Sequence, residues 1–253
     1  MRVLFVLEEP VVIQVVVHID QVLLELLAQT GRQLVVIIVI LRAEIYTFLF
    51  QEQIQFIPVI VRLPDGTMTR ESVTPEAYGK FLCEIFDEWI ANDLGKTDVQ
   101  LFAETSRVWA GGEPSLCWMT GTCGRVLVVE EDGGIYSCDH FVDTDHRLGT
   151  MPSTRLEDAL TSQFQHDFGQ SKRTALTAEC RECPYLDACG GGCLKDRFAR
   201  SADGEEGMYY LCGGLKQYFA HAKPVIDRVM DMSRRGMDPA SIMKELRKEK
   251  KDG

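Results

Sequence analysis

The sequence has no cysteine before Cys83, although it contains nine cysteines in 253 residues. It also has no long apolar run, since the longest uninterrupted one, 34–41, is far too short to cross a bilayer. A signal peptide is not indicated, because Glu8, Glu9 and Pro10 interrupt the short apolar stretch at the amino end. These absences predict a cytoplasmic protein with no membrane partner, in which thiols stay reduced.

An excess of basic residues is absent as well, since the formal net charge is −11. A nucleic-acid partner is therefore not expected, because the binding of phosphates needs a basic surface. The apolar content of 45%, with 12 Phe and 3 Trp, is sufficient for a real core. The length corresponds to one large domain or two ordinary ones.

The first part of the sequence alternates helical and strand-like segments. Helical spacing runs over 19–29, and 44–50 resembles another helix. Residues 34–41 and 54–61 are apolar runs typical of buried strands. Such alternation is the pattern of a parallel sheet covered on both faces, so the predicted fold class is α/β.

The clearest predicted helix runs from Thr74 to Leu94. Thr74 suits the N-cap, Pro75 the first helical position and Gly95 the stop. Cys83 lies beside the apolar stripe of this helix and is expected to be a small packed hydrophobe rather than a ligand. The stripe has helical spacing and consists of Tyr78, Phe81, Leu82, Ile85, Phe86, Trp89 and Ile90.

A β-hairpin is predicted over residues 125–139. Its turn falls at Asp132-Gly133, a pair favoured in hairpins because both central residues need positive φ. Cys138 would then lie at the end of the second strand, where the hairpin holds it rigidly.

Two helices are predicted at the carboxyl end of the sequence. The first spans about 215–234 and breaks near Pro224, since proline cannot donate the helical hydrogen bond. The second begins at Asp238-Pro239 and ends in a Lys-rich tail that is expected to be solvated.

Eight cysteines cluster in the second half of the sequence: Cys117, Cys123, Cys138, Cys180, Cys183, Cys189, Cys193 and Cys212. Eight thiolates complete two four-ligand sites, and iron–sulfur clusters take four such ligands. Two structural zinc sites are the rival interpretation, because Zn²⁺ accepts the same thiolates. The odd total and the reducing compartment disfavour disulfides. The run Gly190 to Gly192 lacks Cβ atoms and would let the backbone approach a cluster closely.

The cysteine motifs and the segments around them resemble, in their order, those of the anaerobic sulfatase-maturating enzymes. These enzymes are radical S-adenosylmethionine proteins with a carboxyl-terminal SPASM domain. The resemblance extends from about Tyr46 to about Tyr218. It is carried by Gln55-Phe-Ile-Pro58, Glu113-Pro-Ser-Leu-Cys117, Cys123-Gly-Arg125, Gly134-Ile-Tyr-Ser-Cys-Asp-His-Phe-Val142, Leu148-Gly149, Phe168-Gly-x-x-Lys172, Cys180-x2-Cys183-x5-Cys189-x-Gly-Gly-Cys193-x-Lys-Asp-Arg-Phe198 and Cys212.

The resemblance implies three parts. Residues 1–110 would be the late strands and helices of a partial (β/α) radical S-adenosylmethionine barrel, without the amino-terminal half of that barrel. Residues 111–220 would be a SPASM domain with two auxiliary [4Fe–4S] clusters. Residues 221–253 would be a helical tail.

The resemblance also implies roles for individual residues. Asp139 would be the base that takes a proton from a substrate Cys or Ser, provided that burial raises its pKa toward the working pH. His140 would be a hydrogen-bonding or simply packed neighbour. Lys195, Asp196 and Arg197 would form a charge network near the cluster. The first cluster would be held by Cys117, Cys123, Cys138 and Cys193, and the second by Cys180, Cys183, Cys189 and Cys212.

The activity implied for a complete enzyme is the oxidation of a sulfatase Cys or Ser to Cα-formylglycine. Its cofactors would include S-adenosylmethionine and a third [4Fe–4S] cluster, and one auxiliary cluster could accept an electron from the substrate. Its partners would be a sulfatase polypeptide and a reducing electron donor such as flavodoxin or ferredoxin.

The sequence departs from the family in one chemically important respect. The motif C-x3-C-x2-C is absent, so this chain alone is not expected to cleave S-adenosylmethionine. Leu194 also stands where the family usually has proline. A non-catalytic iron–sulfur module for electron transfer or peptide binding, a structural zinc protein, and a maturase acting on another peptide are therefore kept as alternatives.

Overall fold

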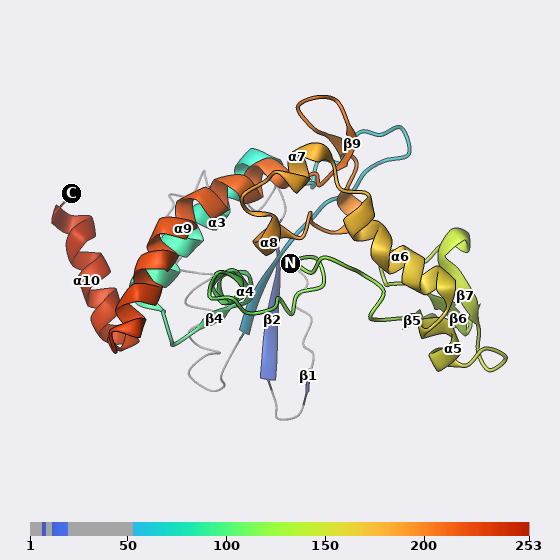
Figure 1. The fold of residues 1–253 in the computed structure, drawn as a ribbon, viewed down its shortest axis with the longest axis horizontal. Coiled ribbons are helices and arrows are strands. Elements are labelled where there is room, and N and C mark those ends of the chain that lie inside the picture. Colours follow the sequence, from blue (N-terminus) through green and yellow to red (C-terminus); the bar gives the residue numbers. More distant parts are fainter. Residues whose placement is uncertain (1–6, 9–11, 20–52, 253) are drawn as a thin grey trace. The chain divides into compact units, whose positions relative to one another are not determined.

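The computed structural model describes residues 7–8, 12–19 and 53–252 (Figure 1). These residues form two compact units, one up to Gly111 and again from Gly213, the other from Gly112 to Cys212. The elements predicted at 34–41 and 44–50, and most of that at 19–29, lie outside the described residues. Within the described part, no helix combines the length and the apolar character that crossing a membrane requires.

The first unit contains a four-stranded open sheet in the order β1-β2-β3-β4. Strands β2 and β3 are parallel, as are β3 and β4, whereas β1 runs antiparallel to β2. The parallel pairing confirms the α/β class, although no closed barrel forms among the described residues. The predicted strand at 54–61 is confirmed in part, since β3 ends at Pro58, which has no amide hydrogen for the ladder. The strands are β1 (Leu7–Glu8), β2 (Val12–Ile19), β3 (Gln53–Pro58) and β4 (Asp98–Val99).

Helix α3 (Pro75–Asn92) confirms the predicted long helix. The hydroxyl of Thr74 accepts a hydrogen bond from the amide of Ala77 at 3.2 Å, which satisfies one of the free donors at the helix start. All seven residues of the predicted apolar stripe are buried. The helix ends two residues earlier than predicted, while Gly95 follows with a φ of +75°.

Aromatic rings from three helices meet in the core of the first unit. The ring of Phe86 in α3 lies 5.3 Å from that of Phe102 in α4 (Gln100–Trp109) and 5.9 Å from that of Tyr218 in α9 (Cys212–Arg234). Helices α3 and α9 run side by side (Figure 1). Their backbones approach closely at Gly79, which has no Cβ atom. A Cβ atom added there would lie only 2.8 Å from the Cα atom of Gly214.

The prediction of a break near Pro224 is wrong, because α9 continues through this residue to Arg234. Proline leaves the carbonyl four residues earlier, that of Ala220, without its helical partner. Both residues are exposed, so water can satisfy that carbonyl, while Ala222 and Ile226 are buried on the opposite side and hold the helix in place. The last predicted helix is confirmed as α10 (Pro239–Asp252).

The second unit consists of two small antiparallel sheets and short helices. The first sheet has the order β5-β6-β7, and β8 pairs with β9. In chain order the elements are β5 (Val128–Val129), β6 (Gly134–Tyr136), η1 (Thr144–His146), β7 (Arg147–Thr150), α5 (Leu156–Leu160), α6 (Gln163–Thr174), α7 (Ala178–Arg181), α8 (Leu186–Cys189), η2 (Leu194–Asp196), β8 (Ala199–Arg200) and β9 (Glu206–Met208).

The predicted hairpin is confirmed as β5 and β6, but its turn differs from the prediction. Gly133 has a φ of +79°, whereas Asp132 has no positive φ. The amide of Gly133 donates to the carbonyl of Glu130 at 2.9 Å, and the amide of Glu130 donates to the carbonyl of Gly134 at 2.9 Å. This pattern is a longer loop in which a single left-handed glycine forms a bulge, so only one position needs positive φ.

Candidate metal centre

The eight clustered cysteines all lie in the second unit and are free thiols. Cys117 and Cys123 lie in the loop before β5, and Cys138 follows β6. The other five are distributed along the short elements that end the unit: Cys180 in α7, Cys183 just after it, Cys189 at the end of α8, Cys193 before η2 and Cys212 at the start of α9.

Four of these thiols influence one another electrostatically in a first group. Burial, together with the charges of Asp196, Cys123 and Cys117, raises the pKa of Cys193 to about 11. Burial also raises the pKa of Cys138 to about 12, with smaller contributions that include the charge of Cys193. Cys117, Cys123 and Cys138 therefore each lie near enough to Cys193 for the charges to interact.

A second group forms around Cys189. Burial, together with the charges of Cys212, Cys180 and Cys183, raises the pKa of this thiol to about 12. These electrostatic influences thus link the predicted ligands as two groups of four, and the assignment of ligands to each metal centre stays a prediction.

The loops that bear the two groups are closely packed at Gly190. This residue has a φ of +57°, and a Cβ atom added to it would lie 2.3 Å from the carbonyl oxygen of Met119. Met119 lies between Cys117 and Cys123 of the first group, whereas Gly190 follows Cys189 of the second. The glycine run was expected to allow close approach to a cluster, and at Gly190 it allows close approach of two protein loops.

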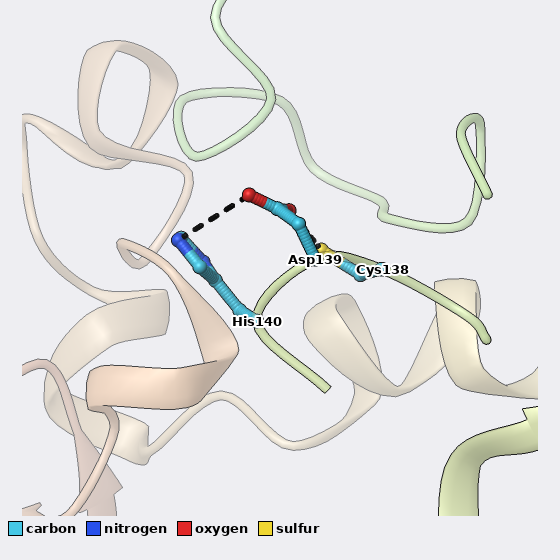
Figure 2. Close-up of side chains that lie close together, drawn as sticks. All are labelled: Cys138, Asp139 and His140. Carbon is cyan, nitrogen blue, oxygen red and sulfur yellow. Dashed lines mark hydrogen bonds and ion pairs between the residues drawn. The ribbon is translucent and has the colours of Figure 1, made fainter. Parts of the chain in front are cut away.

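Cys138, Asp139 and His140 form a compact cluster in which one ligand atom from each lies within 4.8 Å of the others (Figure 2). The thiol of Cys138 donates to Oδ1 of Asp139 at 3.0 Å, and Nε2 of His140 lies 3.8 Å from Oδ2 of Asp139. His140 also reaches the first group, since its Nδ1 atom lies 3.4 Å from Sγ of Cys193.

The condition that burial brings the pKa of Asp139 up toward the working pH is not met in this structure. Burial is the largest single influence and does raise the pKa, but the hydrogen bond from Cys138 and the charge of His140 lower it by more in sum. The net pKa lies below its ordinary value. The side chain of Asp139 is 70% exposed, which explains why burial does not prevail.

A buried cation, Lys172, and a half-buried one, Arg197, also lie in this region, and the sequence did not predict the contacts of either. The ammonium of Lys172 donates to the carbonyls of Cys117 at 2.7 Å and Trp118 at 2.8 Å. The guanidinium of Arg197 donates to backbone carbonyls rather than to Asp196. A signal for the burial of Lys172 exists in α6, because the buried positions Gln165, Phe168, Gly169 and Lys172 have the spacing of one helix face.

Cys83, the ninth cysteine, lies in α3 of the first unit. Its thiol is half-buried, and burial raises its pKa to about 11, with smaller contributions from Asp87 and Glu84. A thiol held protonated in this way is unreactive and suits the predicted role of a packed hydrophobe.

Comparisons with known proteins found matches for this chain. Residues 117–184 match the model of SPASM, an iron–sulfur cluster-binding domain. The serine-type anaerobic sulfatase-maturating enzyme of Bacteroides thetaiotaomicron is 41% identical over 209 residues, which are 77% of this chain and 50% of that protein. The cysteine-type enzyme of Clostridium perfringens strain 13 is 31% identical over 155 residues, which are 60% of this chain and 41% of that protein.

A solved structure shares the fold. The structure described as native anSMEcpe with bound AdoMet and Kp18Cys peptide matches with a TM-score of 0.67 at 24% identity, over 86% of this chain and 57% of that one. The chain therefore spans about half the length of the relatives it matches. The chain is thus similar to the anaerobic sulfatase-maturating enzymes, and its residues 117–184 match an iron–sulfur cluster-binding domain.

Proposed function

We propose that this chain is the auxiliary-cluster part of an anaerobic sulfatase maturase, in the arrangement implied by its motifs. Residues 1–110 are then part of a barrel, 111–220 the cluster-binding domain and 221–253 a helical tail. The complete enzyme oxidises a Cys or Ser of a sulfatase to Cα-formylglycine. The observation that carries this proposal is the convergence of eight cysteines as two groups of four within a unit that contains the SPASM match.

Each group of thiols fits a [4Fe–4S] cluster. Such a cluster takes four thiolates and, when bound, accepts and releases single electrons. The raised pKa values of Cys138 and Cys189 show that burial makes deprotonation of these thiols unfavourable. Positively charged iron would offset the negative charge of the thiolates and so favour their deprotonation. The ligands of one cluster are Cys117, Cys123, Cys138 and Cys193, and those of the other are Cys180, Cys183, Cys189 and Cys212.

Asp139 is the proposed general base. Its exposed carboxylate is ionised at neutral pH, and it is held beside the first group by Cys138 and His140. Deprotonation of Cys138 as a ligand removes a hydrogen-bond donor and leaves negative charge beside Asp139, which increases the affinity of that carboxylate for a proton. The residue can then take a proton from the thiol or hydroxyl of the substrate.

The remaining components belong to the complete enzyme. With no cysteine before Cys83, this chain does not supply C-x3-C-x2-C, so S-adenosylmethionine and the third cluster are bound by other residues. The partners are a sulfatase polypeptide and a reducing donor of the flavodoxin or ferredoxin kind, in the cytoplasm. A non-catalytic electron-transfer or peptide-binding module is the second candidate, and the missing motif favours it.

Metal analysis of cysteine variants tests the proposal. The purified chain, reconstituted without oxygen, is expected to bind about eight iron and eight sulfide ions, as two four-iron clusters require. Cys193→Ala and Cys189→Ala should each lose half of that iron, because each removes a ligand from a different group. Cys83→Ala is the matched control and should keep all of it. About two zinc ions and no iron would contradict the proposal.

Complementation separates the two candidates. A separately supplied fragment that carries C-x3-C-x2-C should restore formylglycine formation with the wild-type chain and not with Asp139→Asn, whose iron content should be unchanged. Redox-active clusters without any restored activity would favour the electron-transfer module.

A further inference from the structure

The second unit contains a buried lysine whose hydrogen bonds go to backbone carbonyls and not to a carboxylate. The side chain of Lys172 is fully buried, and its ammonium donates to the carbonyls of Cys117 and Trp118. Carbonyl groups solvate a cation but do not neutralise it. A buried cation is costly unless negative charge lies near it, so this lysine indicates a source of negative charge in its surroundings.

A half-buried arginine of the same unit, Arg197, lies farther along the chain. Its Nε donates to the carbonyl of Gly191 at 2.8 Å, and its two terminal nitrogens donate to the carbonyls of Gly190 at 2.9 Å and Lys172 at 2.6 Å. Gly190 and Gly191 form the link between Cys189 of one thiol group and Cys193 of the other. Arg197 is therefore placed at the junction of the two groups, whereas Lys172 is bonded to the first.

The electrostatic influences on the two cations follow the same division. Burial lowers the pKa of Lys172, while Cys123 and Cys117 of the first group raise it. Burial likewise lowers the pKa of Arg197, while thiols of both groups raise it, among them Cys180 and Cys123. As ligands these cysteines would be thiolates, and their negative charge would then lie near both cations.

We propose that Lys172 and Arg197 are positioning residues that set the reduction potentials of the two metal centres, Lys172 for the first centre and Arg197 for both. This inference rests on the proposed function. Reduction adds negative charge to a cluster, and a fixed cation stabilises that charge more strongly in a buried site than in water. Each cation therefore raises the potential of the centre or centres that it faces, and the two centres differ because only one of them faces Lys172.

Potentials measured in charge-removing variants test this assignment. In redox titrations followed by electron paramagnetic resonance, Lys172→Met should lower the midpoint potential of the first centre and leave the second unchanged. Arg197→Met should lower both. Cys123→Ala and Cys180→Ala, which each disable one centre, assign the two signals.

Three controls separate charge from scaffolding. Arg173→Met removes an exposed cation from the next position of α6, where solvent screens the charge, and should shift neither potential. Lys172→Arg and Arg197→Lys keep the charge and should keep the potentials close to those of the wild type. If Lys172→Met does not assemble its cluster, Lys172→Gln provides the same comparison with a hydrogen-bond donor retained.

The outcomes distinguish this inference from the proposed function. A wild-type chain without iron–sulfur clusters would overturn both. Intact clusters whose potentials are the same in Lys172→Met and wild type, or that move equally at both centres, would overturn the inference alone. Equal shifts in the charge-keeping and charge-removing variants would do the same, because a purely structural role predicts them.

Discussion

Gly190→Ala tests the close packing of the two cysteine-bearing loops. The added Cβ atom would lie 2.3 Å from the carbonyl oxygen of Met119, and real Cβ atoms essentially never approach closer than 3.0 Å. The backbone must therefore move by at least about 0.7 Å, the difference between these two distances. Because Met119 lies between Cys117 and Cys123, the movement displaces ligands of the first group relative to Cys189.

Two energetic costs combine in this variant. A left-handed backbone costs alanine about 1–2 kcal/mol, and an overpacked contact costs about 1–3 kcal/mol. Gly204→Ala is the matched control, since Gly204 has a φ of +90° and nothing within 4 Å of an added Cβ atom. The difference between the two variants isolates the contact, and about 1–3 kcal/mol corresponds to a roughly 5- to 150-fold change in an equilibrium constant.

Urea unfolding of the metal-free chain and iron content at limiting iron measure this difference. Gly190→Ala should be less stable than Gly204→Ala by about 1–3 kcal/mol, and it should retain less iron because metal binding is coupled to the folded arrangement of the ligands. Equal unfolding free energies and equal iron contents in the two variants would refute the inferred contact.

The remaining predictions concern the first unit. Phe86→Ala should lower the free energy of unfolding by about 3–5 kcal/mol, because the ring is fully buried against Phe102 and Tyr218. Val61→Ala, at a position 46% exposed, is its control and should change that energy by less than about 0.5 kcal/mol in urea unfolding. Asp238 caps α10, and hydrogen bonds from Ser241 lower its pKa, so its stabilisation is present above the unfolded pKa of about 4 and is lost as the pH falls. Asp238→Asn should therefore be less stable than the wild type at pH 6, and this deficit should shrink as the pH falls below about 4; a constant deficit would contradict the assignment.

Local signals were sufficient where a single residue determines the backbone. Thr74 and Pro75 fixed the start of α3, because capping and the φ of proline depend on near neighbours. Pro224 misled for the opposite reason, since buried contacts of α9 outweigh one lost hydrogen bond. The Asp132-Gly133 pair is compatible with two loop types, and the sequence pattern does not choose between them.

For the candidate site as well, some features follow from the local sequence and others need the three-dimensional structure. Cysteine spacing predicted two four-ligand sites, but the distribution of ligands between them came from the family resemblance, because spacing alone leaves several pairings open. The contacts of Lys172 and Arg197 with carbonyls join segments far apart in the sequence, and such pairs leave no local pattern. The lowered pKa of Asp139 depends on Cys138 and His140 together and needs their geometry.

The interleaved order of the cysteines has a consequence for biosynthesis. With the proposed ligands, Cys193 of the first centre emerges from the ribosome after Cys180, Cys183 and Cys189 of the second, and Cys212 emerges last. Neither centre has its full ligand set until three of the four ligands of the other have been synthesised. The first cluster can therefore be completed only after translation has passed Cys193, and the second only after it has passed Cys212. The two closed loops overlap, so each restrains the conformational freedom of the other in the unfolded chain.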